Sequence, residues 1–245
     1  MHEHELWITA LFNDYLAGVG NAILNLVGVH AHDAARPWNN FISMEILVAA
    51  IIMIVALVVK TSLSFDKPGK LQQSFELIYE FLSGQSDEMV GHDGHKYVAF
   101  FGTLFIFILF SNLIGVIPGF ESPTMFPAVP AGCAMATFLV YNILGIREHG
   151  FKYILQFSGT NPWIAPLLFP IEIISHFARP LSLTVRLYAN MFAGEKVTLV
   201  FLTLVPAAIP SIFMGLHVFV SILQAYIFTV LTMIYLGSAI SHEEH

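Results

Sequence analysis

Charged residues are scarce in this chain of 245 residues. Asp, Glu, Lys and Arg together make up 11% of it, whereas 56% of the residues are hydrophobic. A soluble domain carries about a quarter charged residues, because charged groups rarely lie in a protein interior. The apolar residues also occur in long blocks instead of alternating with polar ones. This composition argues against a soluble globular enzyme and against a disordered chain.

Cysteine and phosphate-binding motifs are also lacking. The single cysteine, Cys133, lies in an apolar run, so neither a disulfide framework nor a thiolate metal cluster is expected. No glycine-rich phosphate loop is present, and the net charge of −7 argues against nucleic acid as a partner. The segment His92–His95 is interpreted as a water-exposed loop. We therefore predict no metal, no cofactor and no nucleotide chemistry on this chain.

The chain does contain apolar runs long enough to cross a bilayer, which takes roughly 20 residues of helix. Glu45 interrupts the first run, Pro127 and Pro130 are expected to delay the regular helix of the third, and a break is expected at Pro206 and Pro210. Alternating short strands are absent from the pattern, so a β-barrel is not indicated. We predict an all-α integral membrane protein with about five transmembrane helices, at residues 41–59, 97–117, 124–146, 163–200 and 211–240.

The remaining segments complete the predicted organisation. Residues 41–245 are expected to form a single multi-pass membrane domain, preceded by an N-terminal segment, 1–40, that lies outside and contains an interfacial helix near Leu6–Val27. Residues 71–90 are expected to form an amphipathic helix on the cytoplasmic face. Its apolar residues recur at helical spacing at Leu71, Phe75, Ile78 and Leu82.

The distribution of Lys and Arg predicts the orientation, because cytoplasmic loops carry more of them. The loop after the first span and the loop between the third and fourth spans are basic, whereas the opposite side has only Arg36. The N-terminus is therefore expected outside, and the C-terminus in the cytoplasm. The basic loop residues are Lys60, Lys67, Lys70, Lys96, Arg147 and Lys152.

Five charged residues lie in the fourth predicted span: Glu172, Arg179, Arg186, Glu195 and Lys196. A charge within a bilayer costs at least ~2.5–3.5 kcal/mol on insertion scales. Side chains near the ends of the span can extend to the interfaces, and this interpretation suits Lys196 and Arg179. It fails for Arg186, which lies ~13 Å along the helix from Glu195 and is therefore near mid-membrane.

Helical geometry arranges these residues on faces. At about 100° per residue, a polar stripe forms within about 40° of one line, and His176 lies at its margin. Glu195 lies on the opposite side from Arg186. Two acidic environments with an arginine between them are typical of ion transport along discontinuous paths. The stripe consists of Glu172, Ser175, Arg179, Ser182, Arg186 and Asn190.

The fifth predicted span carries a second polar stripe, formed by His217, Ser221, Gln224 and Tyr235. If the last two helices form a hairpin that turns near Pro206, residues at equal distances from the turn meet. Glu195 is then expected near His217 toward the outer surface, and Arg186 near Gln224 at greater depth. A satisfied, purely structural histidine is the alternative for His217.

The stretch Pro180–Glu195, with the sequence PLSLTVRLYANMFAGE, closely resembles the signature of subunit a of F-type rotary ATP synthases. The stretch His217–Leu236 resembles the final helix of that family. The resemblance extends from about Tyr97 to the C-terminus. It implies a bacterial inner-membrane stator subunit whose partners are a ring of c subunits, the b subunits of the peripheral stalk and the rest of the synthase.

The resemblance also implies roles for single residues. Arg186 would be the essential charge that faces the c-ring. The outer proton pathway would include Glu195, His217, Asn190 and Gln224, and the cytoplasmic pathway Glu172, Ser175, His176 and Ser182, with Tyr235 and Asn112 in support. One departure is Gly115, where some members place an aspartate; Glu121 or Asn112 could substitute for it. ATP chemistry would take place on other subunits.

Two other functions deserve comparison. An intramembrane hydrolase could use Ser175 with His176, or Ser221 with His217, as nucleophile and base. Adjacent helical residues point about 100° apart, however, and no G-x-S-x-G elbow exists. A stand-alone transporter usually has inverted repeats, and none is visible. The sequence leaves open the coupling ion (proton or sodium), the size of the c-ring and the preferred direction of the reaction.

Overall fold

The computed structural model describes residues 5–26, 35–64, 67–91, 94–117, 119–150, 153, 165–204 and 208–240. These residues contain helices and no strand, which confirms the predicted all-α class. In chain order, the elements are α1 (Trp7–Leu26), α2 (Asn40–Thr61), α3 (Lys70–Val90), η1 (Gly94–Tyr97), α4 (Val98–Ile114), η2 (Pro123–Met125), α5 (Ala128–His149), α7 (Ala165–Leu204) and α8 (Ala208–Ile240).

Four of the described helical segments are long and apolar enough to cross a membrane. They are Asn40–Thr61, Gly94–Ile114, Ala128–His149 and Ser211–Ile240. The longest described helix, α7, is not among these four; it has 40 residues and contains the five charges noted above. Large apolar side chains such as Met53, Leu181 and Phe219 are more than half exposed. Exposed apolar side chains of this size fit a surface that contacts lipid.

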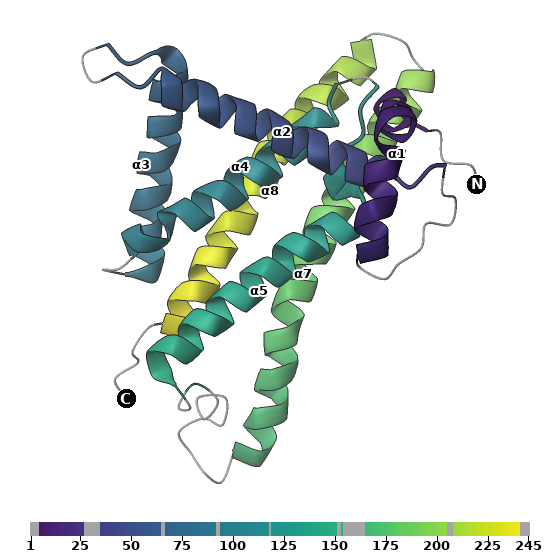
Figure 1. The fold of residues 1–245 in the computed structure, drawn as a ribbon. Coiled ribbons are helices and arrows are strands. Elements are labelled where there is room, and N and C mark those ends of the chain that lie inside the picture. Colours follow the sequence, from purple (N-terminus) through teal and green to yellow (C-terminus); the bar gives the residue numbers. More distant parts are fainter. Residues whose placement is uncertain are drawn as a thin grey trace.

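The main bundle consists of α4, α5, α7 and α8, with α3 packed against it (Figure 1). Phe101 and Ile108 of α4 pack in one buried cluster with Tyr141 of α5, Leu187 of α7 and Phe228 of α8. A second buried cluster joins α1, α2 and the end of α4 through Ile8, Met44, Val48 and Ile114. The first cluster therefore fixes α7 against α8, where the candidate site lies.

Helix boundaries differ slightly from the predictions at prolines. Helix α5 begins at Ala128, directly after Pro127, so the regular helix starts later than residue 124 as expected, and Pro130 lies within its first turn. Helix α8 begins at Ala208, so Pro210 also lies in a first turn. Proline is tolerated there because the first amide groups of a helix have no intrahelical partner. Pro206, the expected break, lies outside the described residues.

The two expected interfacial or amphipathic segments are both helical. Helix α1 is held to the start of α2, because Asn13 accepts a hydrogen bond from the Trp38 backbone at 3.0 Å and Phe12 packs edge-on against the Trp38 ring. Helix α3 turns Ile78 and Leu82 toward the bundle, whereas Leu71 is exposed. Its apolar side thus packs on protein, along α4 and α8.

Candidate functional site

Helices α7 and α8 pack antiparallel, and three pairs define their register. The rings of Phe201 and Phe213 stack at 4.3 Å between centroids. Asn190 Nδ2 donates to Gln224 Oε1 at 2.9 Å. The Arg179 guanidinium lies 5.2 Å from the centre of the Tyr235 ring. Each step of eleven residues along α7 matches a step of eleven along α8, and because eleven residues make about three turns, the same faces meet at all three levels.

This register corrects one predicted pair. Gln224 bonds Asn190, which lies one turn beyond Arg186, instead of Arg186 itself. In each of the three observed pairs, the two residues are equally far in sequence from position 207, which is the centre of the hairpin. The predicted pair of Arg186 and Gln224 would instead place that centre at position 205. A shift of two residues in the centre of a hairpin moves the register by four residues, which is about one helical turn.

Arg186 lies on the outward face of α7. Its neighbours Leu183 and Leu187 are buried in the bundle, whereas Arg186 itself is half-buried. Within the described part of the chain, its guanidinium makes no hydrogen bond and no ion pair. The stripe residues Ser175, Ser182 and Asn190 are exposed on the same helix. Ser175, Ser182 and Arg186 of the predicted stripe therefore lie on the outward side of α7, whereas Arg179 and Asn190 also contact α8.

Glu195 and His217 border one cavity at the level predicted for the outer pathway. Both line a space of about 190 Å³ beside Gly115 and Phe120. Glu195 Oε2 and His217 Nε2 are both buried without a hydrogen-bond partner among the described residues. Glu121 is close enough to act electrostatically on the Glu195 carboxylate. The cavity is large enough to hold several water molecules.

A second cavity lies directly between α7 and α8. It has a volume of about 260 Å³ and includes Asn190, Gly194 and His217 in its lining. The His217 ring lies against Gly194, where an added Cβ would be 3.2 Å from Nδ1. His217 therefore borders both cavities, and the absence of a side chain at position 194 leaves space for its ring.

At the other end of the hairpin, His176 belongs to a hydrogen-bonded cluster. Its Nε2 lies 2.9 Å from Asn142 Oδ1, and the Tyr153 hydroxyl donates to the same oxygen at 3.2 Å. Asn142 Nδ2 donates to the Phe138 carbonyl, which turns Oδ1 toward the histidine. Burial raises the pKa of the Tyr153 hydroxyl above its ordinary value, so this group stays a donor.

Sequence reasoning missed Asn142. The available signal was a carboxamide within the otherwise apolar run 124–146, but its partners lie on α7 and beyond the end of α5. Glu172 was predicted and lies 4.0 Å from the Arg179 guanidinium, at the edge of an ion pair. Ser175 and Ser182 lie on the exposed face and are not part of the His176 cluster.

Asn112 has a fixed position in a buried network instead of lining the outer cavity. Its Nδ2 donates to the Ser221 carbonyl of α8 at 3.3 Å, and its Oδ1 accepts from Thr124 at 2.6 Å. Ser122 bonds both Thr124 and the Ser111 carbonyl. An added Cβ at Gly115 would lie 2.8 Å from Ser122 Cβ. Glycine at 115 therefore lets the segment at Ser122 pack closely on α4.

Comparison with known proteins gives a family. The sequence pattern of the family described as ATP synthase A chain matches residues 42–237. The chain belongs to this family. It is 58% identical to ATP synthase subunit a of Solibacter usitatus (strain Ellin6076) over 234 residues, which are 95% of this chain and 100% of that protein. It is 50% identical to ATP synthase subunit a of Koribacter versatilis (strain Ellin345) over 240 residues, or 98% of each chain.

The resemblance stated from the Pro180–Glu195 stretch is thereby confirmed at the level of the family. Every residue predicted for the site lies within the range matched by the ATP synthase A chain pattern. Family membership and the apolar helices together identify a multi-pass subunit of the membrane sector of an ATP synthase, a complex that transports protons.

Proposed function

We propose that this chain is the stator subunit that carries protons to and from a rotating ring of c subunits, through two half-channels that do not join. The supporting observation is Arg186: a permanent charge on the outward face of α7, without a hydrogen bond or ion pair to any described residue. An unpaired guanidinium in a bilayer is costly. A carboxylate on the facing ring would be its partner.

Arg186 acts as an electrostatic gate in this mechanism. A ring carboxylate must lose its proton before it passes the stator, and the bare carboxylate is unstable in lipid. Guanidinium stays protonated in proteins, so Arg186 stabilises the ionised carboxylate at every turn of the ring. The same positive charge repels a proton that would otherwise cross directly between the two half-channels.

The outer half-channel is assigned to the cavity bordered by Glu195 and His217. The two unpartnered polar atoms in this cavity can each exchange a proton with water. Asn190 and Gln224 lie between this level and Arg186 and hold the hairpin closed through their hydrogen bond. Protons would enter from the outside and reach the ring beside Asn190.

The inner half-channel is assigned to the opposite end of α7. Glu172, Ser175 and Ser182 would line the exit path along the outward face, with His176 behind them in the Asn142 cluster. Arg179 would be held beside the path by Tyr235 and Glu172. Each charge moved through a potential of 100 mV supplies ~2.3 kcal/mol to rotation. ATP would be made on other subunits.

The proposed surroundings follow from the charge distribution. The N-terminus would lie outside a bacterial inner membrane and the C-terminus in the cytoplasm, because the basic loops follow α2 and α5. Helix α1 and the end of α8 lie at opposite ends of the molecule, as this orientation requires (Figure 1). The b subunits of the peripheral stalk would anchor the chain against rotation.

The experiment that tests the proposal replaces Arg186 in the assembled synthase. Arg186→Ala is expected to abolish ATP-driven acidification of inverted vesicles while the complex still assembles. Arg186→Lys is expected to fail nearly as fully, because an ammonium lacks the planar fork and loses its proton more readily when buried. Arg147→Ala, which removes an exposed arginine at the end of α5, is the matched control. Normal acidification by the Arg186→Ala variant would overturn the proposal.

A further inference from the structure

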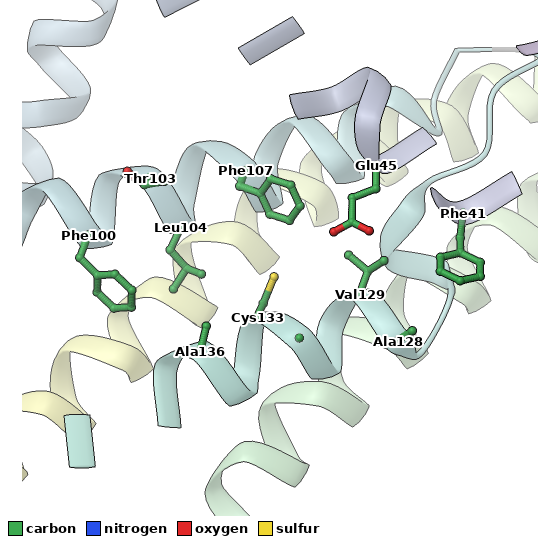
Figure 2. Close-up of a pocket in the computed structure, with 11 residues that line it drawn as sticks. Phe41, Glu45, Phe100, Thr103, Leu104, Phe107, Ala128, Val129, Cys133 and Ala136 are labelled. Carbon is green, nitrogen blue, oxygen red and sulfur yellow. The ribbon is translucent and has the colours of Figure 1, made fainter. Parts of the chain in front are cut away.

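A third cavity lies away from the α7–α8 hairpin, between α2, α4 and α5. It has a volume of about 310 Å³, and its lining is apolar except for Glu45, Cys133 and Thr103. Figure 2 shows the Glu45 carboxylate pointing from α2 into this space, beside Phe107 and above Val129, with Cys133 on the facing wall. None of these residues belongs to the proposed half-channels.

Glu45 is an acidic residue within an apolar span, and its carboxylate makes no hydrogen bond and no ion pair with the described residues. The other polar groups of the lining do not compensate for it. Thr103 donates its hydroxyl proton to the Ala99 carbonyl of its own helix. A carboxylate in hydrocarbon without a partner is unfavourable, so the site favours a ligand that brings positive charge.

The remaining lining decides which kind of cation fits. An inorganic cation needs several oxygen ligands, and no group of three or more metal-binding side chains occurs among the described residues. The cavity instead offers three aromatic rings, those of Phe41, Phe100 and Phe107. Aromatic faces attract an organic ammonium and also accommodate its alkyl groups.

The cavity is accessible from the membrane. Ala128, Gly132 and Ala136 line it on α5 and are exposed, so it opens on the outer surface of the helix bundle. Ile46 of α2 and Met135 of α5 are exposed apolar neighbours of the lining residues. Glu45 lies in the second turn of α2, close to the end of the span, where the charged head of an amphiphile resides.

We propose that this cavity binds the ammonium group of a cationic amphiphile, with Glu45 pairing the charge, Phe107 beside the carboxylate, and the rest of the apolar lining along the alkyl chain. The ammonium can come from a free aliphatic amine or from the head of a phosphatidylethanolamine lipid. The two sources share the chemistry that the cavity recognises.

Cys133 provides a built-in reporter, because it is the single cysteine of the chain and lines the cavity. The whole synthase, reconstituted in phosphatidylcholine vesicles, is treated with N-ethylmaleimide. The Cys133 thiol adds across the carbon–carbon double bond of the maleimide and forms a thioether. The adduct on the peptide that contains Cys133 is followed by mass spectrometry. Dodecylamine is expected to slow this modification about fivefold or more, as a charge-assisted contact would, whereas dodecanol, which has the same chain without the charge, is expected to have little effect.

Three variants separate the charge from the space. Glu45→Gln is expected to reduce the effect of dodecylamine to that of dodecanol. Gly132→Leu places a side chain in the cavity without a clash at its Cβ, because an added Cβ there meets nothing within 4 Å. This variant is expected to abolish the protection of Cys133 by dodecylamine although Glu45 remains. Asp14→Asn removes an exposed carboxylate on α1 and is expected to leave protection unchanged. Replacing phosphatidylcholine by phosphatidylethanolamine identifies the lipid head as the source if it protects Cys133 without added amine.

Equal protection by dodecanol would overturn the proposal, because the cavity would then select for apolar volume alone. Persistent protection in Glu45→Gln would also overturn it. If the thiol reacts too slowly to follow, an aliphatic amine that carries a photoreactive diazirine replaces the maleimide. Its cross-link to residues 128–136 must then disappear in Glu45→Gln, and a cross-link that persists, or none in the unaltered protein, contradicts the proposal.

Discussion

Asn190 donates a hydrogen bond to Gln224 across the two longest helices, one turn beyond Arg186. The bond joins α7 to α8 at the depth where the proposed half-channels come closest. Gln224 is buried and its Nε2 has no partner among the described residues, so the pair is satisfied through one bond only. Beside Arg186, this hydrogen bond therefore adds a polar contact to the apolar packing that holds α7 against α8.

Removing either carboxamide should loosen the hairpin beside Arg186. Asn190→Ala and Gln224→Ala each lose a neutral hydrogen bond, which contributes about 0.5–1.5 kcal/mol. We expect each to slow ATP-driven acidification of inverted vesicles severalfold, and the double variant to be little worse than the poorer single one. Thr184→Ala loses only a bond to Pro180 within α7 and serves as the control. Losses that simply add would show that the two residues act separately.

The Asn142 cluster is expected to control the inner pathway. Asn142→Leu keeps the volume but removes the oxygen that both the Tyr153 hydroxyl and His176 Nε2 contact, and each lost hydrogen bond is worth about 0.5–1.5 kcal/mol. Tyr153→Phe removes one donor and leaves the His176 bond in place. Acidification rates should therefore fall more for Asn142→Leu than for Tyr153→Phe. The opposite order would mean that Tyr153, not His176, is the member that matters.

The ring of Tyr235 should matter more than its hydroxyl. The Arg179 guanidinium lies over this ring, and such a contact contributes about 0.5–1 kcal/mol at a partly exposed site. Tyr235→Phe keeps the ring and should pump within about twofold of the normal rate, whereas Tyr235→Leu should pump about two- to fivefold more slowly. Equal defects in both variants would assign the role to the hydroxyl group.

Much of the fold could be predicted because the bilayer dictates helix length. Uncharged runs such as 97–117 and 124–146 allow few alternatives, and the described helices α4 and α5 lie within a few residues of them. The hairpin was also predictable, since two prolines in a long uncharged stretch indicate a break. The register of the hairpin could not be predicted, because Pro206 locates the turn only to within a residue or two. An error in the position of the turn becomes an error twice as large in the number of the residue that each side chain faces.

The parts that could not be predicted depend on contacts between distant helices. Asn142 becomes a site residue only because α5 packs on α7, 34 positions later in the chain. The Glu45 cavity requires α2, α4 and α5 to leave a space, which no single helix reveals. Gly115 looked like the loss of an acidic group, whereas its contact with Ser122 shows a packing requirement.

That contact makes a side chain at position 115 unfavourable. A Cβ there would lie 2.8 Å from Ser122 Cβ and 3.0 Å from the Ser122 backbone nitrogen, so the loop must move. Gly115→Ala is expected to cost about 1–3 kcal/mol by overpacking and to lower the unfolding temperature of the detergent-solubilised synthase. Gly115→Asp should do so more strongly. Gly84→Ala in α3 meets nothing within 4 Å and should leave the temperature unchanged or raise it.

The outer cavity allows the proposed relay between Glu195 and His217 to be tested directly. Both residues border the same 190 Å³ space, and each has a buried polar atom without a partner there. If they pass one proton between them through water, each residue is useful only while the other is present. Glu195→Gln and His217→Leu should then each slow proton flow, and the double variant should be little worse than the poorer single one, because members of one functional unit are not additive.

Exchange of the two residues distinguishes a relay from two independent groups. The variant with Glu195→His and His217→Glu retains one carboxylate and one imidazole in the cavity and should recover part of the activity lost by either single change. Proton flux in vesicles energised from each side measures the recovery, and Glu121→Gln tests whether the nearby carboxylate contributes. Fully additive losses, with no recovery in the exchanged variant, would show that Glu195 and His217 act separately. In that case no proton passes between them, although they border the same cavity.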